Sequence, residues 1–228
     1  MAYFPMFIDL KGKRCVIAGG GKVACRKAES LCRFEAQVEV IAPEICPELE
    51  AFEDSNREIS FQKRAVERED LVGSFLVIAA TDSRKVNRMV SEFCREEDIF
   101  VNVIDSQEES TFVFPATLKR EDISVGITTS GSSPFLSSSI RKTIEKAVPE
   151  YYGELSKSLG RIREKVKAEV PLESDRRKIM KWVTQTGLEK KEVLSADEVE
   201  QIIKKIQQTD DENQTKDVNQ TGKKQKKI

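Results

Sequence analysis

The sequence of 228 residues contains no histidine. Histidine is the side chain that most often acts as a general base near neutral pH, and it is the commonest protein ligand of transition metals. Proton transfer must therefore fall to carboxylate, hydroxyl, amine or thiol groups, and no metal site is expected. The 38 basic and 39 acidic residues give a net charge of −1 and form no basic stripe, so nucleic acid is not an expected partner.

Long apolar runs are also lacking. No segment has the apolar length of a membrane span, and the first residues carry neither the basic nor the apolar region of an export signal. The five cysteines are odd in number and form no C-x-x-C pair. We therefore expect no membrane partner, a cytoplasmic location, and reduced, mainly buried thiols.

The most informative motif is GGGKVA at positions 19–24, which directly follows the apolar run 15–18 (CVIA). A helical pattern from Val23 to Phe34 and a β-type run from Gln37 to Ala42 complete a βαβ unit. This arrangement is typical of dinucleotide binding, although glycine turns also join strands to helices for packing reasons alone. The residues expected to contact the cofactor are Gly19, Gly21, Lys22, Val23 and Ala24.

An acidic residue is expected at the end of the second strand, and Glu44, after Pro43, occupies that place. A carboxylate there accepts hydrogen bonds from the adenosine ribose and repels a 2′-phosphate, which favours NAD over NADP. Pro43 and Glu44 are thus assigned to the cofactor site. Two alternatives stay open: Glu44 lies in a solvated loop without this role, or Glu39, in the middle of the strand, takes the role instead.

Further strands are expected at 59–61, 75–80 and 100–104, with an amphipathic helix over 83–97. Thr81 and Asp82 end the fourth strand and join the expected cofactor site. Two more strands are expected at 111–115 and 123–128, followed by a small-residue loop and then by helices that are interrupted at Pro149 and Pro171. Ser195 and Glu198 form a capping box that begins a last helix.

Several segments together resemble a known family. They are Pro5-Met6-Phe7 with Asp9-Leu10, Gly19 to Ala24 with Arg26-Lys27, Ala42-Pro43-Glu44, Ala79-Ala80-Thr81-Asp82 with Val86-Asn87, Val101 to Asp105, Phe114-Pro115-Ala116, and Thr129 to Pro134. Over about the first two thirds of the chain, their order and spacing resemble the precorrin-2 dehydrogenase family, the dehydrogenase and ferrochelatase module of siroheme synthesis.

The resemblance implies NAD-dependent oxidation of the tetrapyrrole precorrin-2 to sirohydrochlorin by a homodimer. It also implies an α/β fold: a Rossmann-type parallel sheet, then a strand-rich dimerisation region and a helical C-terminal domain. The expected divisions are 1–112 for the NAD-binding domain, 113–148 for the dimerisation region, 149–208 for the helical domain and 209–228 for a disordered, solvated tail.

The family's key carboxylate matches Asp105, at the carboxyl end of the fifth strand, where ligands of open α/β sheets bind. Loss of a hydride leaves a cationic macrocycle that must release a proton, and a carboxylate can stabilise that charge and accept the proton. Alternatively, Asp105 caps a turn. Substrate carboxylates are expected to contact Ser130, Gly131, Ser132, Ser133 and Arg141, although the serines would also serve as an ordinary helix cap and Arg141 as a surface residue.

Two rival functions remain open from the sequence. A non-catalytic NAD-sensing module would need the glycine turn and Glu44 but has no evident need for Asp105 or the serine loop. A bifunctional dehydrogenase and ferrochelatase is the alternative within the enzyme class, and the lack of histidine does not exclude it, because chelation in the family is attributed to aspartate.

Overall fold

The computed structural model describes residues 3–53 and 58–208 and divides the chain into two compact units. The first unit contains the residues up to Pro115 together with Thr128–Pro134, and the second contains Ala116–Ile127 and the residues from Phe135 onward. The chain therefore leaves the first unit for a short excursion and returns to it before entering the helical part.

The first unit contains a five-stranded parallel sheet of order β3-β2-β1-β4-β5. Its strands are β1 (Arg14–Ala18), β2 (Gln37–Ile41), β3 (Ile59–Gln62), β4 (Leu76–Ala79) and β5 (Phe100–Val103). Ala18 is in register with both Ile41 and Ala79, and Ala79 with Val103, so the carboxyl ends of four strands lie along one edge. The predicted Rossmann-type α/β fold is confirmed.

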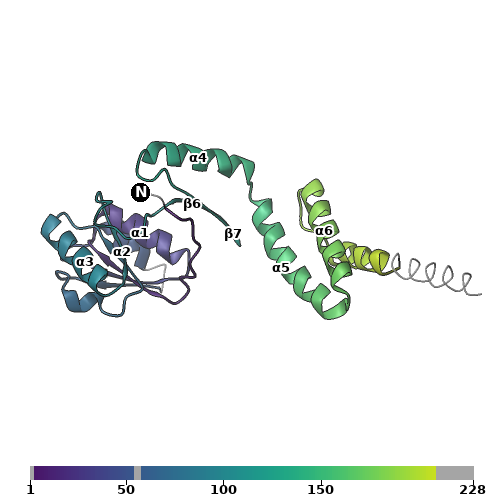
Figure 1. Ribbon diagram of the computed structural model, residues 1–228, viewed down its shortest axis with the longest axis horizontal. Helices are drawn as coiled ribbons and strands as arrows, with labels where there is room; N and C mark the ends of the chain where they lie inside the picture. The colour runs from purple at the N-terminus through teal and green to yellow at the C-terminus, as the bar shows by residue number, and fades with distance from the viewer. Residues whose placement is uncertain (1–2, 54–57, 209–228) are drawn as a thin grey trace, which may run out of the picture. The chain divides into compact units, whose positions relative to one another are not determined.

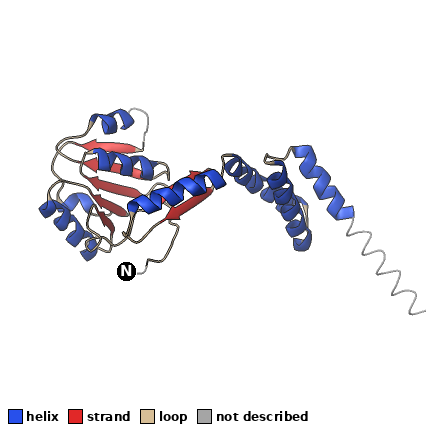
Figure 2. Ribbon diagram, turned by 90° about the horizontal axis from the view of Figure 1, so that it is seen from above, coloured by secondary structure: helices blue, strands red, loops and turns tan. Residues whose placement is uncertain are grey.

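Helices cover both faces of this sheet (Figure 2). On one face, α1 (Lys22–Cys32) and α2 (Pro47–Glu53) bury Ala28, Leu31 and Leu49 against the strands. On the other face, α3 (Arg84–Glu96) and the 3-10 helix η1 (Arg68–Leu71) pack over β4 and β5. The central strand β4 is continuously apolar, with four consecutive buried residues, because both of its sides are covered.

The second unit begins with an antiparallel hairpin of β6 (Ala116–Arg120) and β7 (Ile123–Ile127). The prediction of a strand at 111–115 is therefore wrong. Thr111 instead donates its backbone N–H to Val101 at 2.8 Å, and Asn102 bonds the carbonyl of Phe112, so this segment covers the free edge of β5. Residues 116–120, which lie between the two expected strands, form the first strand of the hairpin.

Helices make up the rest of the second unit (Figure 1): α4 (Pro134–Ala147), α5 (Tyr151–Glu169), α6 (Glu173–Lys190) and a helical stretch over 196–208. The last three share an apolar core that includes Val166, Ile179, Val183 and Ile203. The predicted capping box is confirmed, since the Ser195 amide donates to Glu198 at 2.8 Å and the Glu198 amide donates to the Ser195 hydroxyl at 3.3 Å.

The predicted tail at 209–228 lies outside the described residues. Within 3–53 and 58–208, none of the helices combines the length and apolar character that crossing a membrane requires. The sequence analysis did not foresee α2 or η1. Both are shorter than the segments in which helical periodicity is recognisable.

Candidate functional site

The glycine loop joins β1 to α1 at the carboxyl edge of the sheet. Gly19 has φ +123°, and a Cβ there would overlap the carbonyl oxygen of Ala80. A Cβ on Gly20 would overlap the carbonyl oxygen of Glu44. Gly19 and Gly20 are therefore required for packing against the neighbouring loops. Gly21 differs, because a Cβ there would have no atom within 4 Å and would project into open space.

Open space at Gly21 adjoins the amino end of α1. Gly21 is the N-cap of this helix and has no side chain to bond the first amides, so the N–H groups of Lys22, Val23 and Ala24 have no intrahelical acceptor. The helix has 11 residues, and its amino end carries a partial positive charge as well as these free N–H groups. Such a helix end, preceded by a glycine, suits the negatively charged pyrophosphate of a dinucleotide. Lys22 is exposed and lies 3.7 Å from Glu48.

Glu44 and Pro43 follow β2 at the same edge, and both are exposed. The backbone of Glu44 lies directly against Gly20. The carboxylate of Glu39, the alternative residue, accepts from Arg14 at 2.7 Å and from the amide of Gln62 on a face of the sheet. Of the two acidic residues, Glu44 is thus the one whose side chain is exposed beyond the end of β2.

Thr81 and Asp82 follow β4, the neighbour of β1, and Asn87 on α3 holds Thr81 in place. The Asn87 amide donates to the Thr81 carbonyl at 2.9 Å, and its oxygen accepts from the Thr81 amide at 3.2 Å and hydroxyl at 2.7 Å. Asn87 is 8% exposed. In the sequence analysis Asn87 appears only within a segment that resembles the family, and no local pattern identifies it as the support of this loop.

Asp105 occupies a tight turn after β5. The Ser106 amide donates to the Val103 carbonyl at 3.3 Å, and the Ser110 hydroxyl accepts from the Val103 amide at 2.9 Å. Asp105 is exposed and has φ +60°, in the left-handed region that favours glycine. Aspartate tolerates this region better than most other non-glycine residues, and Asp98 shares it with φ +54°.

The serine loop is a turn in which the Ser132 amide donates to the Thr129 carbonyl at 3.0 Å. Both central residues, Ser130 and Gly131, have positive φ, +54° and +83°, as in a type I′ turn. The Thr129 hydroxyl accepts from the Ser133 amide at 3.1 Å, so a threonine caps this loop. Ser130 and Ser132 are exposed.

Gln107 joins the Asp105 loop to the serine turn. Its amide nitrogen donates to the Ser130 carbonyl at 3.3 Å and to the Tyr3 hydroxyl at 2.8 Å, and a Cβ on Gly131 would lie 2.8 Å from its oxygen. Sequence reasoning missed Gln107 and Tyr3.

Arg141 lies on α4 in the second unit, where its guanidinium is 3.0 Å from Glu145.

Lys27, on α1, is a largely buried lysine that lies against an aromatic ring. Its ammonium lies 3.8 Å from the centroid of the Phe114 ring. Burial, together with neighbouring Arg26, lowers its pKa from 10.5 to about 8.

The cysteines behave as core residues: all five are free, and burial raises the pKa of Cys15 to about 12, which keeps it protonated and unreactive.

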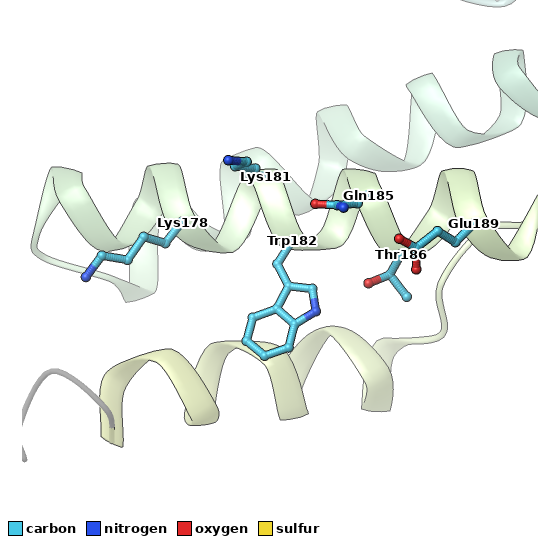
Figure 3. Close-up of a pocket in the computed structure, with 6 residues that line it drawn as sticks. All are labelled: Lys178, Lys181, Trp182, Gln185, Thr186 and Glu189. Atoms are coloured by element: carbon cyan, nitrogen blue, oxygen red, sulfur yellow. The ribbon is translucent and has the colours of Figure 1, made fainter.

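Figure 3 shows a cavity of about 350 Å³ on α6 of the second unit, lined by Lys178, Lys181, Trp182, Gln185, Thr186 and Glu189. It contains none of the predicted site residues, and all its lining residues come from one helix. The described residues hold no group of histidine, cysteine and carboxylate side chains placed to bind a metal ion.

Comparisons with known proteins agree with this geometry. Residues 6–116 match the family model described as "Putative NAD(P)-binding". The siroheme synthase of Thioalkalivibrio sulfidiphilus is 42% identical over 171 residues, which are 75% of this chain and 35% of that protein. The siroheme synthase of Photorhabdus laumondii is 40% identical over 167 residues, 73% of this chain and 35% of that protein. The chain thus spans about a third of these relatives.

A solved structure described as "SirC, precorrin-2 dehydrogenase" has the same fold. It superposes with a TM-score of 0.70 at 23% identity, over 90% of this chain and all of that protein. The order of a parallel sheet, a small antiparallel sheet and a helical C-terminal part is therefore shared with a known protein.

Proposed function

Because this chain belongs to the precorrin-2 dehydrogenase family, we propose that it oxidises precorrin-2 to sirohydrochlorin with NAD as the hydride acceptor. The observation that carries the proposal is the arrangement along one edge of the sheet. Three adjacent strands end side by side: the glycine loop follows β1, Thr81 follows β4 and Asp105 follows β5. Cofactor and acid–base groups meet at such an edge in open α/β sheets.

The chain's own residues fit a dinucleotide. Open space at Gly21 and the uncapped amides of α1 suit the pyrophosphate, and exposed Glu44 suits an unphosphorylated ribose. NAD, when bound, supplies the acceptor for a hydride from the macrocycle. Residues of the glycine loop and the Thr81 loop would hold it against the edge where Asp105 projects.

Asp105 takes the proton that the oxidation releases. In the balanced reaction, precorrin-2 loses two hydrogens, one as a hydride and one as a proton, and becomes sirohydrochlorin. The macrocycle is cationic between these two losses, so a carboxylate beside it lowers the energy of that state and then accepts the proton. The exposure of Asp105 after β5, at the carboxyl edge of the sheet, supports this role.

The serine turn binds substrate carboxylates. Ser130 and Ser132 present exposed hydroxyls beside Gly131, and the turn directly precedes α4, a helix of 14 residues. Gln107 connects this turn to the loop of Asp105. Ser133 and Arg141 complete the proposed substrate set, with Arg141 offering a guanidinium for carboxylate pairing.

The protein acts as a homodimer, and residues 113–148 form the dimerisation region between the NAD-binding part and the helical part. Two observations support this. The two-stranded hairpin contributes only Leu118 to the buried apolar residues, and Phe135, Leu136 and Ile140 on α4 are 86%, 51% and 37% exposed. A two-stranded hairpin that contributes so little to a core is suited to burial against a second copy of the chain. Five free thiols support a reducing, cytoplasmic location.

One assay separates this function from its rivals. Purified protein is incubated anaerobically with precorrin-2 and NAD, and ferrous or cobaltous ion is added after oxidation is complete. NADH production with no later metal insertion supports the dehydrogenase, insertion by the protein supports the bifunctional enzyme, and NAD binding without oxidation supports the sensor.

A further inference from the structure

A network of charged side chains lies on the half of the sheet formed by β1, β2 and β3. Arg14 bonds Glu39 at 2.7 Å, Glu39 accepts from the Gln62 amide, and the oxygen of Gln62 accepts from Arg64 at 2.5 Å. The network ends on Asp70, whose two carboxylate oxygens accept from Arg64 at 2.7 Å and 2.5 Å. Arg64 is therefore held by a bidentate ion pair.

The backbone of Arg64 lies close to the loop assigned to the adenosine ribose. The carbonyl of Gln62 accepts two backbone hydrogen bonds, from Ala42 at 3.1 Å and from Arg64 at 3.0 Å. The backbones at positions 42 and 64 thus share one acceptor at the carboxyl edge. Glu44 follows Ala42 by two residues, so a long side chain at position 64 can reach the loop that carries Glu44.

The ion pair with Asp70 decides what Arg64 can bind. In dinucleotide-binding folds an arginine near the ribose accommodates the 2′-phosphate of NADP. We propose that Asp70 is a specificity-determining residue that holds Arg64 away from the 2′-phosphate position and so makes the site selective for NAD. This inference rests on the proposed function and adds a second selectivity element to the carboxylate of Glu44.

Asp70 is well placed to keep Arg64. Its side chain is 11% exposed, and it also accepts the Glu67 amide at 2.8 Å in the capping box of η1. The bond from Arg64 holds the pKa of Asp70 below its ordinary value. The neighbouring cation, Lys63, is likewise paired, with Glu50 at 2.6 Å. Both basic side chains that follow β3 are thereby neutralised by carboxylates of the protein.

The test measures binding of NAD⁺ and NADP⁺ by isothermal titration calorimetry to the full chain. Asp70→Asn keeps an acceptor for the Glu67 amide but removes the charge that holds Arg64, and Asp70→Ser is a second variant with the same purpose. We expect either to tighten NADP⁺ binding by about ten-fold, with NAD⁺ affinity unchanged. The gain should fall at high ionic strength.

Two controls make the result specific. Glu50→Gln removes the negative charge from the carboxylate that pairs with Lys63. This variant should tighten NADP⁺ binding less than the Asp70 variants do, or not at all. Asp70→Asn combined with Arg64→Ala should return NADP⁺ affinity to the parent value. Unchanged NADP⁺ affinity in both Asp70 variants would overturn this inference, as would a gain in NADP⁺ affinity that persists without Arg64. Either result would leave the proposed function intact. A parent protein that binds neither dinucleotide would contradict the proposed function and this inference with it.

Discussion

The side-chain amide of Gln107 donates a hydrogen bond to the backbone carbonyl of Ser130, with a distance of 3.3 Å. The same nitrogen donates to the Tyr3 hydroxyl. One side chain thus connects three segments that are remote in sequence: the loop of Asp105, the serine turn and the N-terminal segment. The relative position of the proposed proton acceptor and the proposed carboxylate-binding turn depends on this contact.

Gln107→Ala should raise KM for precorrin-2 by about three- to ten-fold, because loss of one hydrogen-bonding side chain loosens the serine turn without removing a reacting group. We expect kcat and NAD affinity to stay near the parent values in steady-state assays. Glu108→Ala, in the same loop, is the matched control and should change neither constant. A fall in kcat with unchanged KM would contradict this positioning role.

Asp105→Ala and Asp105→Asn should retain NAD affinity but lose oxidation rate by about two to four orders of magnitude, the usual range for a positioned acid–base group. Single-turnover measurement of NADH formation tests this. Near-parent rates in both variants would make Asp105 structural, and loss of metal insertion alone would assign it to a chelatase step.

Replacement of Asp105 also has an expected effect on stability. Asp105→Gly should be more stable than Asp105→Ala by about 1 kcal/mol, because φ +60° strains alanine and not glycine. Urea unfolding of the two variants measures the difference. Equal stabilities would mean that the turn relaxes and that no conformational strain is stored at this position.

Gly21→Val should abolish NAD binding and leave the protein folded, since a Cβ at this position has no protein atom within 4 Å and the added side chain would take up space assigned to the pyrophosphate. Gly160→Ala is the matched control: its Cβ is also free of contacts, but it lies on α5. Calorimetric titration and circular dichroism give the two readouts. NAD affinity that survives in Gly21→Val would remove the pyrophosphate from this loop.

Lys27 should make stability depend on pH. Its pKa is about 8 in the folded protein and about 10.5 when unfolded, so the unfolded chain binds more protons between these values and folding is favoured as pH rises. Relative to Lys27→Met, the parent should gain on the order of 1–3 kcal/mol from pH 7 to pH 10. The comparison cancels the thiols, whose raised pKa values act in the opposite direction. A constant difference would contradict the assignment.

The parent protein should have the mass of a dimer in light scattering at micromolar concentration, and Phe135→Asp should shift it toward a monomer. Phe135 is 86% exposed in the single chain, and a charge there would be costly to bury in an interface. A monomeric parent would contradict the dimer. The exposed Phe7 offers a control, since Phe7→Asp lies outside the proposed dimerisation region.

The sheet could be predicted from the sequence because its signals are local. Continuous apolar runs mark strands buried on both faces, and residues 19–24 mark the first turn. The strand predicted at 111–115 failed for a tertiary reason: Thr111 and Phe112 satisfy their backbone groups on the edge of β5. Alternation of apolar residues cannot distinguish such an edge-covering segment from a strand of a separate hairpin.

The supports of the site could not be predicted for a similar reason. Asn87 and Gln107 act through contacts across the fold, and neither stands in a pattern that marks a ligand. The roles of the glycines were only partly foreseen. Gly19 and Gly20 are required because neighbouring loops lie against them, and that proximity is a property of the folded sheet. Of the three glycines in this loop, Gly21 is the one that faces open space.

The return of Thr128–Pro134 to the first unit limits how this protein can be divided. A fragment that ends at residue 116, where the dinucleotide-binding family model ends, would keep the glycine loop and Asp105 but lose the serine turn. If the proposed function holds, we expect such a fragment to bind NAD but not the tetrapyrrole. Recombination between relatives therefore has to preserve the hairpin with its return segment, and a working chimaera needs its junction beyond Pro134.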